Sequence, residues 1–305
     1  MRRSLLLLAV ALLAPADRAA GEHPYADADP MENRKRAIMG WAASGAAAAP
    51  FVPGLLRDLA DPDPDIRWRA EFALGRIGAA GVPRLVEALT SPDVEIRRAA
   101  AYVLGPIGPR ANAAAPALRQ SAADDDPAVR CWAAKSLGDI EPASPESVAV
   151  FATALRDEDP DVRRVAVTIL ARLGPAGKAA VPALIGLLKD PDAGIRWRTC
   201  IALRQSGPEA ATAVPALVIC LKDVDADVRS RAAQALGRIG PAAAPELVRA
   251  LKDNDVRARR VAAELLGSLG GGAQTARKAL EAAALSDADP AVRQAAADAL
   301  RLIPE

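Results

Sequence analysis

Side chains that could carry acid–base or nucleophilic chemistry are almost absent from this sequence. Its 305 residues include one histidine, His23, and three cysteines, Cys131, Cys200 and Cys220. Histidine-based catalysis and Ser-His or Cys-His nucleophiles therefore lack a base in the body of the chain. The cysteines lack the paired spacing of a zinc site, and no phosphate-binding glycine loop with its lysine is present. We expect no enzymatic activity, no metal site and no cofactor.

The three cysteines leave two interpretations open. Cys200 and Cys220 fall on successive predicted helices, so a disulfide between them is conceivable, although an odd count leaves at least one thiol unpaired. Alternatively, all three fill small buried positions where alanine stands elsewhere in the chain. We favour this second interpretation.

Acidic residues and arginines recur together along the chain. The acids are Asp63, Asp93, Asp126, Asp161, Asp192, Asp227, Asp255 and Asp289. They could suggest calcium, but no calcium-loop spacing is present, and capping of the free N–H groups of a following helix explains them more simply. The arginines are Arg67, Arg97, Arg130, Arg163, Arg196, Arg229, Arg259 and Arg293. They predict a structural ladder of ion pairs between neighbouring repeats. A basic track for a polyanion is the other interpretation, weakened because each arginine has its own acids beside it.

These residues belong to a phrase that occurs eight times, most clearly at 63–78, 92–108 and 225–240. An acidic turn is followed by a β-branched residue, arginine, small residues and Leu-Gly. The arginines recur at a nearly constant interval, which is shorter only from Arg67 to Arg97 and from Arg229 to Arg259.

A second phrase precedes each copy of the first. It has proline and then apolar residues at helical spacing, as in 181–190. Each unit is therefore predicted to be two short helices, A and B, with helix B ending at the Leu-Gly glycine. Such pairs must stack, because one pair cannot bury its apolar stripe alone.

The phrase D-x-D-x-V-R-x-x-A-A-x-x-L-G resembles HEAT repeats, particularly the short type first described in phycobilisome lyases, over roughly 50–305. The resemblance implies an all-α, right-handed α-solenoid of about eight two-helix repeats that binds proteins. A minority of relatives assist bilin attachment, and some HEAT-like proteins bind DNA. Ala171, Arg204 and Arg301 replace the glycine of the phrase, so those helices are expected to run on or to close differently.

The ends of the chain differ from the repeats. Residues 1–16 read as a signal peptide, because two arginines precede an apolar run and the small residues Ala14-Pro15-Ala16. The run is shorter than the ~20 residues of a spanning helix, so no stable membrane span is expected after cleavage. An uncleaved anchor is the other interpretation. Residues 17–30 are predicted to be a flexible linker, 31–50 an N-terminal capping helix and 51–305 the solenoid.

Two positions on each B helix, one and five residues after the arginine, lie beside the buried stripe. Aromatic and arginine side chains, the types that dominate interface energetics, occupy these positions mainly in the first five units. The predicted partner contacts are Trp68, Phe72, Arg98, Tyr102, Arg164 and Trp197. In related solenoids the B helices line the concave surface, which implies that this row faces a partner. Alternatively these rings pack against loops or adjacent B helices, and Trp132 is assigned to the core.

The leading hypothesis is an exported scaffold, periplasmic or extracellular, that recognises a protein or peptide on its concave B-helix surface. Nucleic acid is disfavoured, because 39 basic and 38 acidic residues leave a net charge of only +1. A lyase-like or accessory role with a tetrapyrrole chromophore is the alternative that the resemblance alone supplies. Export and the missing histidine in the repeats count against it. A DNA-binding enzyme would need a basic concave surface and residence in the cytoplasm.

Signal cleavage after Ala16 predicts a mature chain that begins at Asp17. Intact-mass measurement of the product recovered from the envelope fraction checks this expectation. Ala16→Tyr should leave the leader attached, because the cleavage site requires a small residue there. A chain of full mass in the membrane fraction would instead identify an uncleaved anchor.

Overall fold

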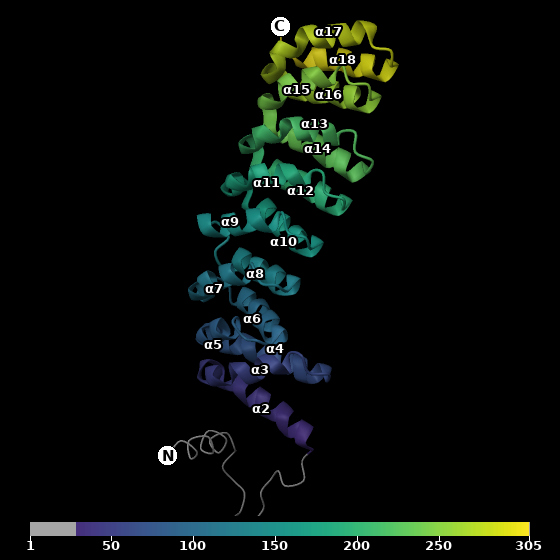
Figure 1. Cartoon of the computed structure of the whole chain (residues 1–305). Coiled ribbons are helices and arrows are strands. Elements are labelled where there is room, and N and C mark those ends of the chain that lie inside the picture. Colours follow the sequence, from purple (N-terminus) through teal and green to yellow (C-terminus); the bar gives the residue numbers. More distant parts are fainter. Residues whose placement is uncertain (1–28, 305) are drawn as a thin grey trace, which may run out of the picture.

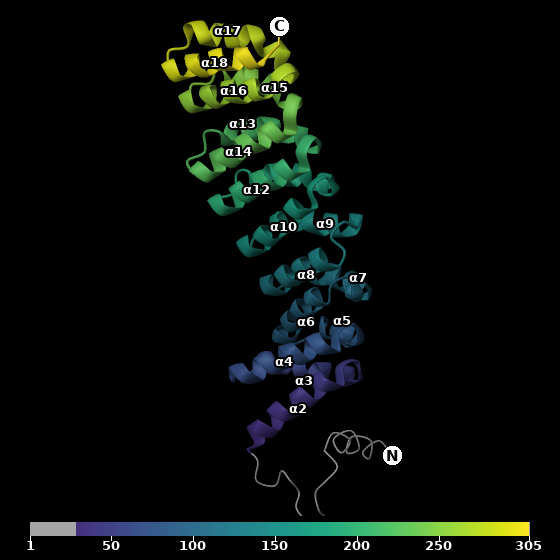
Figure 2. The same cartoon turned by 180° about the vertical axis from the view of Figure 1, so that it is seen from behind.

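The computed structural model describes residues 29–304 as a column of stacked helices, shown from opposite sides in Figures 1 and 2. The predicted signal peptide, its cleavage site and most of the predicted linker lie outside the described residues. Within 29–304 every regular element is a helix, and none is a strand. Eight A–B pairs follow one another from α3/α4 to α17/α18, which confirms the predicted all-α solenoid of about eight repeats.

The helices fall into three sets along the column. The B helices are α2 (Pro30–Ser44), α4 (Pro64–Ile77), α6 (Val94–Ile107), α8 (Pro127–Ile140), α10 (Pro160–Leu173), α12 (Ala193–Ser206), α14 (Ala226–Ile239), α16 (Val256–Ser268) and α18 (Pro290–Leu302). The A helices are α3 (Val52–Asp58), α5 (Val82–Ala88), α7 (Ala115–Ser121), α9 (Pro145–Ala154), α11 (Val181–Leu187), α13 (Val214–Cys220), α15 (Ala244–Ala250) and α17 (Arg277–Ser286). Short 3₁₀ segments connect most pairs, namely η1 (Gly45–Phe51), η2 (Gly78–Gly81), η3 (Gly108–Ala114), η4 (Gly174–Ala180), η5 (Gly207–Ala213), η6 (Gly240–Ala243) and η7 (Gly270–Ala276).

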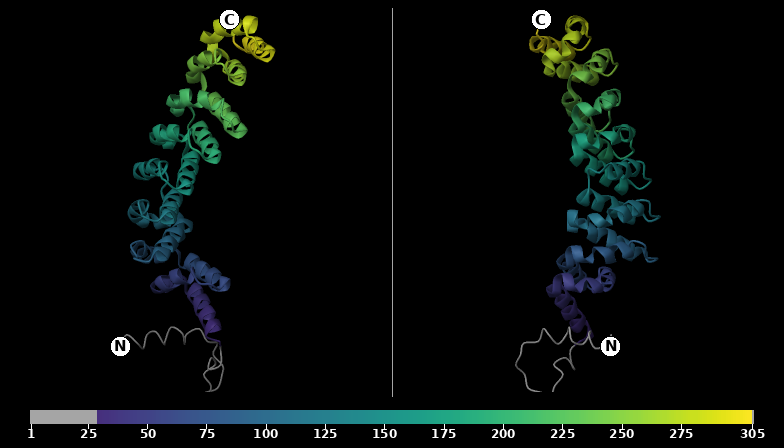
Figure 3. Two further views of the ribbon diagram at one scale, coloured as in Figure 1. Left: turned by 45° about the vertical axis from the view of Figure 1, so that its right-hand side comes forward. Right: turned by 90° about the vertical axis from the view of Figure 1, so that its left-hand side faces the viewer.

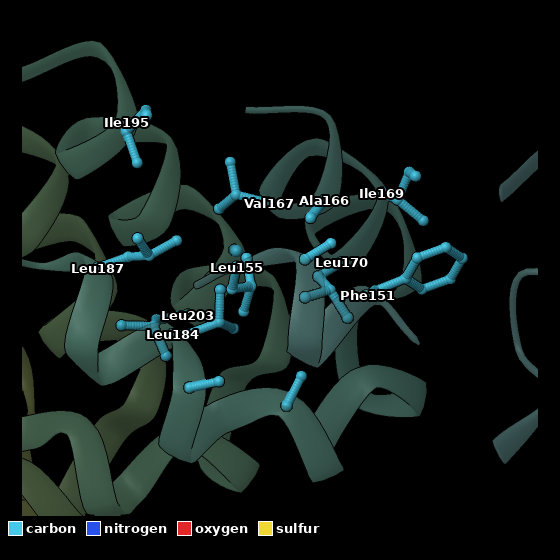
Figure 4. Packing of buried hydrophobic residues seen from close by; sticks show 14 of the residues in the cluster. Phe151, Leu155, Ala166, Val167, Ile169, Leu170, Leu184, Leu187, Ile195 and Leu203 are labelled. Carbon is cyan, nitrogen blue, oxygen red and sulfur yellow. The ribbon is translucent and has the colours of Figure 1, made fainter. Parts of the chain in front are cut away.

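The column is gently curved, as the left view of Figure 3 shows, with the B helices on its inner side and the A helices on its outer side. Its core is one continuous cluster of buried side chains that extends from Ile38 in α2 to Ile303 after α18. Figure 4 shows part of this cluster, which includes Phe151 of α9, Leu155 at the end of that helix and Leu170 of α10. The stripe predicted on each B helix is buried, as Ile66, Ala70 and Leu74 illustrate in α4.

Helix α2 behaves as the B helix of an additional half repeat. It packs on α4 as the later B helices pack on one another, and Arg34 stands one repeat before Arg67 along the chain. The Asp29 side chain accepts a hydrogen bond from the Met31 N–H, so the last residues of the predicted linker 17–30 belong to this helix. The helix predicted at 31–50 is in fact α2 followed by η1, because Gly45 turns the chain with a φ of +52°.

The stretch Pro30–Asp58 has the length and apolar composition of a membrane-spanning segment. In the structure, however, the turn at Gly45 divides it into α2, η1 and α3. Ile38, Val52 and Leu55 of this stretch are fully buried in the core of the column. These three side chains thus belong to the core of the solenoid.

The acidic caps follow the prediction in six of the eight units. In α10 and α14 the N-cap is Asp159 or Asp225, two residues before the predicted Asp161 and Asp227. The cap must have an extended backbone while its carboxylate accepts N–H groups of the first turn, and Asp159 meets both conditions with a φ of −79° and a ψ of 124°. The second acid of the phrase already lies within the helix.

Most B helices end one turn later than predicted. The Leu-Gly glycine lies inside the helix, and a second glycine with positive φ ends it, as Gly75 and Gly78 show in α4. Helices α10 and α12 also end at such a glycine, Gly174 and Gly207, so the replacements at Ala171 and Arg204 do not extend them. Helix α18 ends at Leu302 without a glycine.

The Leu-Gly glycine instead permits close approach of successive B helices. A Cβ at Gly138 would lie 2.9 Å from the Ile169 side chain of α10, and one at Gly267 would lie 2.8 Å from the Ala299 Cα of α18. At Gly75 nothing would lie within 4 Å, and at Gly237 the nearest atom would be at an ordinary 3.7 Å. These last two glycines face the junctions α4/α6 and α14/α16, where the B helices make few contacts.

Five of the eight aligned arginines pair with an aspartate of the next repeat. In the rung formed by Arg130, Nε and Nη2 bind the Asp157 carboxylate at 2.8 and 2.7 Å. Its Nη1 binds the Asp124 carbonyl of its own turn at 2.9 Å. The same arrangement recurs at Arg97–Asp124, Arg163–Asp190, Arg196–Asp223 and Arg259–Asp287. Each of these acids also accepts the N–H of the following N-cap, so one carboxylate fixes both the turn and the neighbouring repeat.

Three aligned arginines do not pair with a carboxylate in this way. Arg293 belongs to the last described repeat, and the described residues include no further repeat for it to pair with. Arg67 and Arg229 bind only carbonyl oxygens of their own turns. Both precede a shortened repeat, because the 3₁₀ connection that follows, η2 or η6, has four residues where the other five described 3₁₀ connections have seven. The sequence prediction missed a further rung at the other end of the column, where Arg34 pairs with Asp58 and Asp61.

Arg130→Ala should lower the free energy of unfolding by about 1.5–3 kcal/mol, because it leaves the Asp157 carboxylate, itself only 11% exposed, without its partner. Arg229→Ala, which removes only hydrogen bonds to carbonyls, should cost about 0.5–1.5 kcal/mol. Urea unfolding followed by circular dichroism compares the two variants. Equal losses in the free energy of unfolding would show that the ion pair with the next repeat adds no stability beyond the hydrogen bonds to the carbonyls of the turn.

Gly75→Ala should raise the free energy of unfolding by about 1 kcal/mol, because alanine has the higher helix propensity and its methyl group would contact no other atom there. Gly267→Ala should lower it by about 1–3 kcal/mol, because its methyl group would overlap the backbone of α18. The same unfolding measurement tests both substitutions. Stabilisation by both would contradict the close approach of α16 and α18.

Candidate functional site

The short connection before α5 leaves an opening between α4 and α6 on the B-helix side. A groove of about 560 Å³ lies there, lined by residues of α3, α4 and α6 and by Trp132 of α8. Because η2 has only four residues, α6 does not approach α4 as closely as most successive B helices approach one another, and α14 and α16, joined through η6, show the same wider spacing. The groove thus lies at the junction of a shortened repeat.

Aromatic rings form the walls of this groove. Trp68 and Phe72, one helical turn apart on α4, are stacked with centroids 5.7 Å apart and remain 55% and 43% exposed. On the opposite wall Tyr102 of α6 meets Trp132 edge-on at 4.8 Å. The Tyr102 hydroxyl donates a hydrogen bond of 2.6 Å to Glu71 across the groove. Stacked rings that remain half-exposed offer apolar surface in a fixed orientation.

Most charged groups around the groove are engaged within the protein. The Arg98 guanidinium binds both oxygens of Asp126 and also contacts Glu95 at 2.6 Å. The hydrogen bond from Arg98 lowers the pKa of Asp126 to about 2. The hydrogen bond to Glu71, together with burial, raises the pKa of Tyr102 above its ordinary value. Both side chains therefore keep their usual charge states at neutral pH.

The structure brings four of the six predicted contact residues together. Trp68, Arg98 and Tyr102 line the groove, and Phe72 stacks on Trp68 beside it. Arg98, however, forms an inter-repeat ion pair with Asp126, so it supports α6 against α8 rather than being free for a partner.

The two other predicted contacts, Arg164 and Trp197, lie on α10 and α12, outside the groove. Arg164 pairs with Asp161 at 2.7 Å. The Trp197 ring is half-buried and is covered by Arg198 at 4.1 Å. The contact over the Trp197 ring thus comes from its own helix, neither from a loop nor from an adjacent B helix as the alternative interpretation expects.

Sequence reasoning missed two lining residues. Trp132 was assigned to the core, but it is only half-buried and forms a wall of the groove, with Lys135 lying 4.6 Å from its ring centroid. Arg67 was assigned to the ladder, but it is exposed and lines the groove without an ion-pair partner. The signal that could have revealed both is the shortened interval between Arg67 and Arg97.

The other hollows and side-chain clusters of the described chain are weaker candidates for a functional site. A second hollow of about 550 Å³ lies between the ends of α9 and α11, and among its charged residues Arg163 pairs with Asp190 and Asp157 pairs with Arg130. Within residues 29–304 no group of acidic, histidine or cysteine side chains is arranged to hold a metal ion. Cys200 and Cys220 are buried free thiols, Cys131 is partly buried, and burial raises the pKa of Cys131.

Comparisons with known proteins agree with this architecture. The family of HEAT repeats matches the sequence at residues 52–138, 82–157, 148–223 and 214–301, which together extend over most of the solenoid. No curated protein matches the chain in sequence.

Solved structures share the fold at low identity. An engineered protein is 23% identical, with 91% of this chain and 86% of that chain covered and a TM-score of 0.52. Kap95 in its complex with Nup1 is 17% identical, with 89% of this chain and 44% of Kap95 covered and a TM-score of 0.59. The complex of CpcE and CpcF of phycocyanin lyase from Nostoc sp. PCC7120 is 27% identical over 72% of this chain and 86% of that chain, and its TM-score is only 0.44.

Proposed function

Because this chain belongs to the family of HEAT repeats, we propose that it is a binding scaffold that holds a protein or peptide in the groove between α4 and α6. The observation that carries the proposal is the pair of half-exposed, stacked rings of Trp68 and Phe72 at this groove. They are the exposed aromatic side chains of the described residues. The likeness to Kap95 concerns the fold alone, but that protein is an array of this kind with another protein bound.

The energetics of such a site favour a macromolecular partner with an apolar side chain. Large aromatic rings bury about 150–250 Å² each, at about 25 cal/mol per Å². Covering the exposed half of Trp68 and of Phe72 would thus contribute on the order of 2 kcal/mol per ring. Because both rings are held by packing on α4 and on each other, little side-chain entropy is lost on binding. The groove therefore suits a short segment with one large apolar anchor.

The location of the binding partner follows from the amino-terminal segment. The arginine pair, apolar run and small residues of 1–16 support export, and the partner would then be an envelope or extracellular protein. The tetrapyrrole alternative gains no support from the groove, whose lining residues include neither cysteine nor histidine. The structural likeness to the lyase complex, with a TM-score of 0.44, is too low to support a tetrapyrrole function.

The double substitution Trp68→Ala with Phe72→Ala should weaken partner binding at least tenfold while leaving the helical circular dichroism unchanged, because both rings are exposed. Affinity capture with the full chain from its own envelope extract, followed by mass spectrometry and titration of the captured protein, measures this effect. Trp197→Ala serves as the matched control, since this ring is half-buried and lies outside the groove.

A protein retained equally by the wild-type chain and by the double variant would place its binding elsewhere on the solenoid. A protein lost only from the double variant would locate the binding site at this groove.

A further inference from the structure

We propose that the segment held in this groove carries an aspartate or glutamate next to its apolar anchor, and that the acidic side chain binds Arg67. The carboxylate of the partner would take the place that an aspartate of the next repeat takes in the other rungs of the ladder. This inference rests on the proposed function, because it specifies the partner of the same groove.

The ladder shows which atoms of the arginine accept a carboxylate. At Arg130 and Arg196, Nη1 is bound to carbonyls of the arginine's own turn, while Nε and Nη2 bind both oxygens of one aspartate. Arg67 makes the first half of this arrangement, with Nη1 at 2.8 Å from the Asp61 carbonyl and 2.9 Å from the Pro62 carbonyl. Its guanidinium is thereby held in the orientation of the complete rungs. In the described part of the chain, no carboxylate pairs with its Nε and Nη2.

Repeat length, rather than residue type alone, leaves this rung incomplete. The turn that follows Arg67 has Ser91 where the complete rungs have an aspartate. The other short repeat does have an aspartate at this position, Asp253, yet Asp253 pairs with Lys222 at 2.7 Å and not with Arg229. The shorter connection thus separates the arginine from the next turn in both places. Only the first of these two junctions carries exposed aromatic rings.

The remaining charges at the groove do not substitute for the missing acid. Glu95 is bound by Arg98, and Glu71 accepts the Tyr102 hydroxyl although it stands one helical turn from Arg67. Arg98 is itself held by Asp126. Among the charged side chains that line the groove, Arg67 therefore retains free donors suited to a carboxylate.

Bidentate binding of a carboxylate by a prepositioned arginine gives strong and directional recognition. Trp68 follows Arg67 directly in α4, so the acidic side chain and the apolar anchor of the partner would lie close together. A basic or purely apolar segment would leave these donors without a partner when it covered them, which costs affinity. The groove thus selects acidic segments with a large apolar residue nearby.

A random dodecapeptide display library, selected on the full chain and counter-selected on Trp68→Ala, supplies peptides that use the groove. We expect these peptides to carry aspartate or glutamate beside an aromatic or aliphatic residue. Each peptide and its Asp→Asn or Glu→Gln version is then titrated against the wild type, Arg67→Ala and Arg229→Ala. Arg67→Ala and the amide peptides should each bind about 10- to 100-fold more weakly, and combining them should add little further loss.

Arg229→Ala is the matched control, because it removes an equivalent incomplete rung at a junction without exposed aromatic rings, and it should bind like the wild type. Arg67→Lys should retain part of the affinity, since lysine keeps the charge and loses the fork. The amide peptides test the carboxylate on the wild-type protein, so the result does not depend on how Arg67→Ala folds. Peptides that require Trp68 but tolerate both Arg67→Ala and the amide change would overturn this inference and leave the proposed function standing. If no selected peptide depends on Trp68, both proposals fail.

Discussion

The distance between successive B helices is the constraint on which the rest of this structure depends. Each helix pair exposes an apolar stripe that the neighbouring pairs cover, so close approach of successive B helices stabilises the array. Small residues make this approach possible. The interior glycines of α8 and α16 lie so near the next helix that a methyl group would overlap it. A repeat of the usual length permits the contact, and the two shortened repeats do not.

The arginine rungs follow from the same spacing. Where the helices are close, one guanidinium reaches two carbonyls of its own turn and both oxygens of the next aspartate, as at Arg130 and Asp157. Such largely buried pairs add little net stability over an apolar contact, because desolvation offsets much of the attraction. Their partners and geometry are specific, however, so each complete rung defines the register of one repeat on the next. Burial of the apolar stripes supplies the stability.

A shortened repeat changes both features at once. The glycine of α4 meets no neighbour, Arg67 loses its acid, and a groove opens between α4 and α6. The second short repeat, between α14 and α16, also lacks a complete rung. There Lys222 pairs with Asp253, the aspartate at the position that binds arginine in the complete rungs, and no aromatic ring is exposed. The same structural change thus gives a functional candidate only where the side chains suit it. The candidate site thus occupies one defined point along the solenoid.

The sequence by itself determined the features that recur with the period of the helix and with the period of the whole repeat. The two-helix units, the buried stripe of residues such as Ile66 and Leu74 and most of the aspartate caps depend on local chain geometry, and that is visible in residue spacing. Spacing also placed Trp68 and Tyr102 on one face. Only the tertiary structure decided the role of the Leu-Gly glycine, the wall formed by Trp132 and the open donors of Arg67. Each of these depends on how far apart two neighbouring repeats lie, a distance set by the packing of whole helices.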